Sequence, residues 1–190
     1  MATEEQIAAR VKRKGLKSGL STEYTGFFKI KPGHAKQLIE GVMAALTSRG
    51  PDVRVSYAAI GVYDAKYVLF DNDTRLLLHI AFNNDFDTYF DDALMLLSGG
   101  NLGKTGASWI NNLEGSPLEG GKGTWEDLKN FMVLHQVDAS IYANTTDATV
   151  KGVQKALRLQ KAFQQVLDNP AAAQALSNPV LKPLLDEAAS

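Results

Sequence analysis

The stretch that decides the fold reads Tyr63-Asp-Ala-Lys-Tyr-Val-Leu-Phe70, then Asp71-Asn-Asp-Thr74, then Arg75-Leu-Leu-Leu-His-Ile-Ala-Phe82. Two strand-like runs flank four residues that favour turns, and this arrangement predicts a β-hairpin. The turn pairs Phe70 with Arg75. Counting back from that pair opposes Val68 to Leu77, Lys66 to His79 and Asp64 to Ala81.

Side chains alternate between the two faces of a strand, so these paired residues share one face of the hairpin. The opposite face is wholly apolar and is predicted to face the core. It consists of Tyr63, Ala65, Tyr67, Leu69, Leu76, Leu78, Ile80 and Phe82. The first face carries Asp64, Lys66 and His79 on an otherwise apolar wall. Such a wall is typical of a small-molecule cavity.

Hydrophobic spacing and breaking residues predict the elements around the hairpin. Strands are expected at 24–31 and 138–144, and helices at 38–46, 86–97, 124–135 and 150–166. The order is β-α-β-β-α-(insertion)-β-α, the split β-α-β plan of a ferredoxin-like α+β protein.

Three parts are expected along the 190 residues. Residues 1–21 form an N-terminal tail or helix. Residues 22–168 form the ferredoxin-like domain, which carries a glycine-rich insertion at 98–123. Residues 169–190 form a C-terminal tail, in which prolines allow only short helical pieces.

Such a sheet covers one face with its own helices and leaves the other face bare. The bare face carries several apolar residues among its polar ones, namely Phe27, Val68, Leu77, Ala81 and Tyr142. This surface is too apolar to lie in water, so we expect a second copy to cover it. Two sheets that close face to face form a barrel with an enclosed space. The sequence therefore predicts a homodimer.

The chain resembles the dimeric α/β-barrel superfamily in two features. One is the order of its elements, and the other is the strand-turn-strand at residues 66–92 that leads into a helix beginning with Asp-Phe-Asp. The resemblance covers roughly residues 22–168 and is one of fold. That superfamily includes small oxygenases, isomerases, haem-dependent peroxidases and dismutases, and proteins with no known chemistry. The fold alone does not select one of these activities.

The candidate catalytic residues are His79, Lys66 and Asp64, because the hairpin places all three on the bare face. The lysine would attract an anionic substrate group, Asp64 would hold the lysine, and the imidazole could move a proton near neutral pH. The expected substrate contacts are Phe27, Trp109 and Tyr142. A bulge near Gly61 or Asp64 would break this parity. The alternative interpretation is a polar patch at a dimer interface.

His135 lies on an apolar helical stripe, seven residues after Leu128. One interpretation is a core histidine bonded to a backbone carbonyl; the other is a haem ligand or proton donor. Haem and the absence of any cofactor are therefore left as equal alternatives. No metal site is expected, because the acids at 71–73 are usual turn formers and those at 85–92 have no histidine at ligand spacing.

Eight of the sixteen glycines fall between Gly99 and Gly123. The stretch Ser98–Thr105 looks like a phosphate loop, but it lacks the first glycine and follows a helix, so nucleotide binding is not expected. A long segment of this kind is either a functional cover or disordered, and both alternatives stay open. As a cover it would place Trp109 over the mouth of the cavity.

The composition argues against several classes of protein. The formal net charge of −1 gives no field that favours nucleic acid or an anionic membrane. No apolar run is long enough to span a bilayer, and no signal peptide is expected. Cysteine is absent, which excludes disulfides and a thiolate nucleophile. We expect a cytoplasmic protein without nucleic-acid or membrane partners.

Together these features predict a small-molecule enzyme with its site in the cavity of a dimeric barrel. The resemblance, and not the residues, implies oxidoreductase chemistry of the oxygenase or peroxidase kind. The alternative is a non-catalytic homodimer that binds a ligand or whose barrel is filled by side chains.

Overall fold

The computed structural model describes residues 17–48, 50–98, 108–121, 123–137 and 141–189. The chain divides into two compact units, Met1–Val150 and Lys151–Ser190. The expected domain extended to residue 168, so the observed division falls earlier, at the start of the last long helix.

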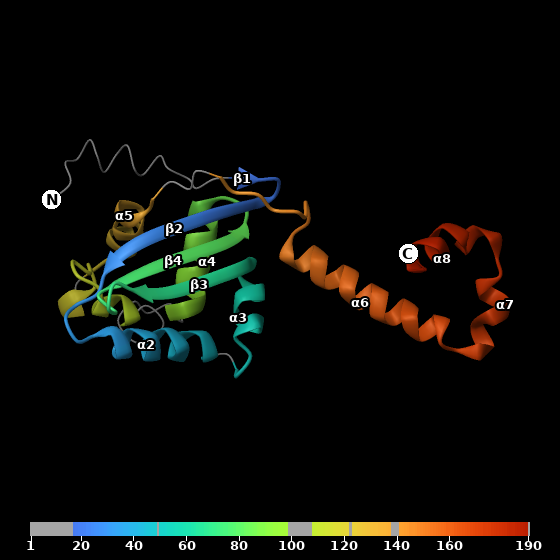
Figure 1. Cartoon of the computed structure of the whole chain (residues 1–190), viewed down its shortest axis with the longest axis horizontal. Helices are drawn as coiled ribbons and strands as arrows, with labels where there is room; N and C mark the ends of the chain where they lie inside the picture. The colour runs from blue at the N-terminus through green and yellow to red at the C-terminus, as the bar shows by residue number, and fades with distance from the viewer. Residues whose placement is uncertain (1–16, 49, 99–107, 122, 138–140, 190) are drawn as a thin grey trace. The chain divides into compact units, whose positions relative to one another are not determined.

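A four-stranded antiparallel sheet forms the centre of the first unit (Figure 1). Its strands are β1 (Lys17–Ser18), β2 (Ser21–Lys29), β3 (Val62–Phe70) and β4 (Arg75–Asn83), in the order β1-β2-β4-β3. The predicted hairpin register is confirmed, from Phe70 opposite Arg75 to Asp64 opposite Ala81. Residues 71–73 form the turn with positive φ, which short polar side chains tolerate.

One hairpin residue does not lie where simple alternation places it. A β-bulge between Val62 and Asp64 shifts the register, so Val62 rather than Tyr63 lies opposite Phe82. Val62 is buried in the core, whereas the Tyr63 hydroxyl donates to the carbonyl of Ala148. The prediction that Tyr63 faces the core is wrong. The bulge precedes Asp64, so the parity of the remaining pairs is kept.

Helices α2 (Ala35–Thr47), α3 (Val53–Ala59), α4 (Phe86–Ser98) and α5 (Trp125–His135) pack on one face of the sheet, which we call the inner face. Figure 1 shows α4 behind the strands. The core combines alternate strand residues with the apolar helix stripes and includes Tyr24, Phe28, Leu76, Leu78, Phe82, Leu38, Val42, Phe90, Leu128 and Phe131. The predicted capping box of Thr124 and Asp127 begins α5.

The predicted strand 138–144 is not formed in its described part. Residues 138–140 lie outside the described residues, and residues 141–144 have no strand structure. Beside β2 the described chain makes an isolated bridge between Gly26 and Gln136, and Val137 N donates to Thr25 O at 2.8 Å. The α+β class is therefore confirmed, whereas a ferredoxin-like arrangement is not.

The described part of the glycine-rich insertion belongs to the core. Residues 99–107 and 122 lie outside the described residues, and the remainder contains the 3-10 helices η1 (Ser108–Asn112) and η2 (Glu119–Gly121). Its large apolar side chains are buried, namely Trp109, Ile110, Leu113 and Leu118. A bridge between Ile30 and Leu113 ties the segment to the chain after β2. Residues 108–121 are therefore neither a cover nor a disordered segment.

The second unit consists of one long helix followed by short helical pieces. α6 (Val150–Leu167) leads into η3 (Pro170–Ala172), α7 (Ala173–Leu176), η4 (Pro179–Leu181) and α8 (Lys182–Ala188). Asn169 and Asn178 each precede a proline and cap the next turn with the side-chain oxygen. The prediction of short pieces beyond Pro170 is confirmed. No helix in the described part of the chain is long and apolar enough to cross a membrane.

Candidate functional site

The sheet face opposite the helices, which we call the outer face, carries the candidate site. Strand alternation and the observed registers assign its residues. They are Ser21, Glu23, Thr25, Phe27 and Lys29 from β2, Arg75, Leu77, His79, Ala81 and Asn83 from β4, and Asp64, Lys66, Val68 and Phe70 from β3.

The part of the outer face near the hairpin turn carries exposed apolar side chains beside Lys29 and Arg75. Phe27 and Val68 are 41% and 45% exposed, and the Phe27 and Phe70 rings meet edge to face with centroids 5.7 Å apart. On the inner face the neighbouring Phe28 is almost fully buried. Apolar side chains gathered on one exposed face are typical of an interaction surface.

The other end of the outer face is covered by the segment 142–148. Tyr142 Oη lies 2.5 Å from Ser21 Oγ on β2, and the Ala148 carbonyl accepts a hydrogen bond of 2.6 Å from Tyr63 on β3. The segment therefore spans this end from β2 to β3. Tyr142 reaches the outer face as we expected, but from an irregular segment rather than from a strand.

At the border between the covered and the open part, Glu23, Thr25 and His79 form a hydrogen-bonded chain. Thr25 Oγ1 donates to Glu23 Oε2 at 2.8 Å and lies 3.0 Å from His79 Nδ1. The Glu23 side chain is 1% exposed and that of His79 is 24% exposed. Of these hydrogen-bonded residues, Glu23 is shielded from solvent, whereas the His79 imidazole is partly exposed.

The single hydroxyl proton of Thr25 fixes the tautomer of His79. Thr25 gives that proton to the Glu23 carboxylate, so Nδ1 of the imidazole must donate to Thr25. Neutral His79 then carries its proton on Nδ1 and presents Nε2 as an acceptor. In hydrolase triads a carboxylate bonds the imidazole directly and holds its tautomer and orientation; here Thr25 makes the contact with the imidazole, and Glu23 Oε2 lies 4.0 Å from His79 Nδ1.

Asp64 and Lys66 lie on the same face as a separate pair. Lys66 Nζ is 3.3 Å from Asp64 Oδ2, both side chains are exposed, and Lys66 lies opposite His79 in the β3–β4 pairing. An exposed ion pair of this kind contributes at most about 1 kcal/mol to folding. The structure thus brings His79, Lys66 and Asp64 to one face with Phe27, as predicted. The acid linked to His79, however, is Glu23.

Sequence reasoning missed Glu23 and Thr25. The expected first strand began at Tyr24, whereas β2 begins at Ser21. Alternation counted back from Phe27 would have placed Thr25 on the outer face. It would also have placed Glu23 there if the strand had been expected to begin earlier. That Thr25 lies beside His79 depends on the β2–β4 register, which joins distant segments and is not set by a local pattern.

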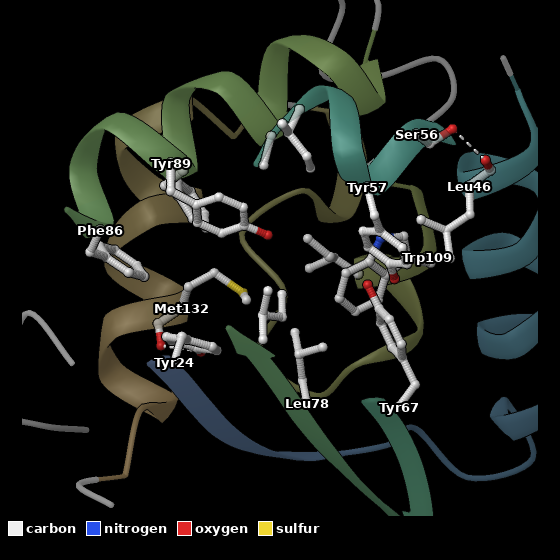
Figure 2. A pocket seen from close by; sticks show the side chains of 15 residues that line it. Tyr24, Leu46, Ser56, Tyr57, Tyr67, Leu78, Phe86, Tyr89, Trp109 and Met132 are labelled. Carbon is white, nitrogen blue, oxygen red and sulfur yellow. Dashed lines mark hydrogen bonds between the residues drawn. The ribbon is translucent and has the colours of Figure 1, made fainter. Parts of the chain in front are cut away.

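Trp109 lies on the inner side of the sheet and does not join the outer-face residues. It is 5% exposed, and its ring meets Tyr67 edge on with centroids 5.8 Å apart. Both rings line an internal cavity (Figure 2). Trp109 is therefore not a cover over a site that contains His79. The closely spaced apolar residues Trp109, Ile110 and Leu113 were the sequence signal for a buried turn.

His135 also packs on the inner side. Its ring stacks on Phe28 with centroids 4.9 Å apart, and Nδ1 lies 2.8 Å from the Phe131 carbonyl oxygen. These contacts match the interpretation of a core histidine. His135 and His79 approach the sheet from opposite sides, so the candidate haem ligand and the candidate catalytic histidine do not share a site. Within the described residues, His, Asp and Glu do not gather in groups of three that could hold a metal ion.

Comparisons of the chain with protein-family models, with curated proteins and with solved structures gave no match. The resemblance to the dimeric α/β-barrel superfamily therefore stays a prediction.

Proposed function

We propose that the chain is a small-molecule enzyme whose site lies on the outer face, closed by the same face of a second copy. The order and directions of β2, β4 and β3 agree with the first, third and second strands of a split β-α-β unit. The exposed Phe27 and Val68 give that face the apolar surface that a second copy would bury. A specific dimer of this kind buries more than about 1,000 Å² in total.

The observation that carries the enzyme proposal is the row of hydrogen bonds that links Glu23, Thr25 and His79. It fixes a half-buried imidazole in one tautomer, on the sheet face that also carries the exposed Phe27 and Val68. In the proposed reaction Nε2 of His79 moves a proton to or from the substrate. Lys66, held by Asp64, attracts an anionic substrate group, while Phe27 and Tyr142 contact its apolar part. Oxygenase- or peroxidase-like chemistry is the class that the resemblance implies.

A non-catalytic homodimer is the second candidate. It is favoured by the ion pair of Lys66 with Asp64, because a lysine that is already paired can serve an interface as well as a substrate. In that case the two outer faces pack together and leave no enclosed space. The polar chain that ends at His79 would then fix β2 against β4.

Binding of small carboxylates tests the enzyme proposal. Benzoate, pyruvate and isobutyrate are titrated into the full chain, with benzamide as the neutral counterpart of benzoate, and the melting temperature is followed. At least one carboxylate is expected to stabilise the wild type more than benzamide does. That gain should be lost in Lys66→Met and kept in the control Lys36→Met, which removes an exposed lysine on α2.

His79→Gln separates binding from structure, because glutamine keeps a polar side chain without a titrating imidazole. Loss of carboxylate stabilisation or of turnover, with an unchanged melting temperature without ligand, supports a site. If His79→Gln and Lys66→Met lower only the melting temperature, the residues form an interface network and the enzyme proposal fails. Absorbance of the purified protein, in which haem gives a Soret band, tests haem binding separately.

A further inference from the structure

An internal cavity lies between the inner face of the sheet and the helices. Its volume is about 50 Å³, and residues from β2, β3, β4, α2, α3, α4, α5 and η1 line it. The walls are mostly apolar and include Leu78, Phe86 and Met132 (Figure 2). A cavity needs about 10–15 Å³ of such volume to hold one water. This one therefore has room for a few waters or for one small molecule.

Most polar groups in the cavity wall already have partners in the protein. The Tyr24 hydroxyl donates to the Met132 carbonyl at 2.8 Å, and Ser56 Oγ donates to the Leu46 carbonyl at 2.9 Å. The hydroxyls of Tyr57 and Tyr67 hydrogen-bond to each other. These groups fix the shape of the wall.

Tyr89 differs from the other hydroxyl-bearing residues of the wall. It is 7% exposed, its ring stacks on Phe82 with centroids 4.0 Å apart, and its hydroxyl points into the cavity (Figure 2). Among the residues that the structure describes, none is a hydrogen-bond partner of this hydroxyl. A buried hydroxyl without a partner is costly, so the cavity has a polar position that a bound molecule can satisfy.

Among the described residues that line the cavity there is no Asp, Glu, Lys, Arg or His, so these residues offer nothing to pair with a charged ligand. Burial raises the pKa of Tyr89 and, well above its usual value, the pKa of Tyr67. The hydroxyls therefore stay protonated at neutral pH, and Tyr89 acts as a hydrogen-bond donor. A ligand that suits this wall is apolar, uncharged and carries one acceptor.

We propose that this cavity binds a small neutral molecule, a ketone or aldehyde of about the size of a five-membered ring, whose carbonyl oxygen accepts a hydrogen bond from Tyr89. This site is distinct from the outer face, because its walls belong to the other side of the sheet. It does not depend on the function proposed above.

Carbon-detected methyl spectra of the full chain test the proposal, with cyclopentanone as the probe. Two ligands of the same number of non-hydrogen atoms serve as comparisons: methylcyclopentane lacks the acceptor, and isobutyrate is charged. Cyclopentanone is expected to shift the methyl signals of Met132 and Leu78 and to give intermolecular NOEs to Met132. Isobutyrate should leave these signals unchanged, even if it binds at the outer face.

Tyr89→Phe isolates the hydrogen bond, because phenylalanine keeps the stacking on Phe82. The variant should weaken cyclopentanone binding roughly threefold to tenfold, the loss of one net hydrogen bond, and leave methylcyclopentane binding unchanged. Tyr63→Phe, which removes a hydroxyl on the other side of the sheet, should change neither. Equal loss for both ligands in Tyr89→Phe, or no loss for either, would overturn the proposed contact.

The wild-type measurements decide the proposal even if Tyr89→Phe does not fold. Absence of NOEs from cyclopentanone to Met132 at millimolar concentration shows that the cavity holds only water and overturns the proposal. Binding of isobutyrate at the same methyl groups also overturns it, because a neutral wall should exclude a carboxylate.

Discussion

At the scale of single residues, the Thr25 hydroxyl decides which nitrogen of His79 carries the proton. Its only proton goes to Glu23, so Nδ1 of neutral His79 must be protonated. Nitrogen spectra of histidine-labelled protein, recorded above the imidazole titration, are expected to show this tautomer. Thr25→Val keeps the side-chain shape and removes the hydroxyl that contacts His79 Nδ1. In this variant a larger fraction of neutral His79 should carry its proton on Nε2.

His34 is the internal control for that measurement. Its Nδ1 lies 3.0 Å from Asn112 Oδ1, a partner that is none of Glu23, Thr25 and His79. Its signals should therefore not change in Thr25→Val. A wild-type His79 that is protonated on Nε2 would show that the hydrogen-bonded chain does not exist as described.

Tyr89 gives a prediction on pH and stability. Burial raises its pKa in the folded state above the usual value of about 10 that it has in the unfolded chain. Folding therefore favours the protonated hydroxyl. This contribution to the free energy of unfolding is fully present below about pH 10 and is lost as the pH rises toward the folded-state pKa. Denaturant unfolding at several pH values should show wild-type stability falling more steeply above about pH 10 than that of Tyr89→Phe. Parallel pH profiles would contradict the prediction.

At the scale of elements, α5 depends on its N-terminal cap. Thr124 accepts the Asp127 N–H at 3.1 Å, and the Asp127 carboxylate accepts the Thr124 N–H at 2.9 Å. Thr124→Ala removes the side-chain acceptor and should lower the free energy of unfolding by about 1 kcal/mol. Thr145→Ala, at an exposed position, should change it by less than about 0.5 kcal/mol. Equal effects of the two substitutions would show that the cap does not stabilise the fold.

The buried turn η1 gives a second prediction at this scale. Trp109 and Ile110 are buried against the sheet and α2, so Trp109→Ala should cost about 3–5 kcal/mol in the free energy of unfolding. Trp125→Ala, at a half-buried position on α5, should cost less in the same denaturant experiment. If Trp109→Ala is as mild as an exposed substitution, the segment is a cover rather than part of the core.

The hairpin could be predicted from the sequence because its signals are local. The turn at 71–74 sets the pairing, and alternation then assigns each residue to a face. A bulge near Gly61 or Asp64 was foreseen as a risk, and the observed bulge lies between Val62 and Asp64. Nothing in these residues marks which of them is the extra one. The face shared by Lys66 and His79 was therefore predictable, whereas the exact orientation of Tyr63 was not.

Elements that depend on distant contacts were harder to predict. Residues 141–144 have the alternation of a strand, but that part of the chain instead contacts Ser18 and Ser21 through hydrogen bonds of Asn144 and Tyr142. The core position of Trp109 was hidden by the glycines around it, whose spacing gives no periodic pattern. Glu23 was missed because its link to His79 exists only after β2 has paired with β4.

At the scale of the whole molecule, the central claim is that a second copy covers the outer face. Phe27 and Val68 are exposed in the single chain, on the same face as His79. Without that cover, the imidazole and Lys66 lie on an open surface rather than in an enclosed space. The claim therefore decides between a cavity and a plain surface patch.

The reactivity of one introduced thiol tests this claim most directly, because the natural chain contains no cysteine. Val68→Cys places a thiol on the outer face, and Val55→Cys places one at an exposed position of α3 on the helix side. Reaction with a chromogenic disulfide reagent is followed as the protein concentration rises through the micromolar range. We predict that Cys at position 68 reacts more slowly as the protein associates, while Cys at position 55 reacts at a constant rate. Fast reaction at both positions at every concentration would contradict a covered outer face.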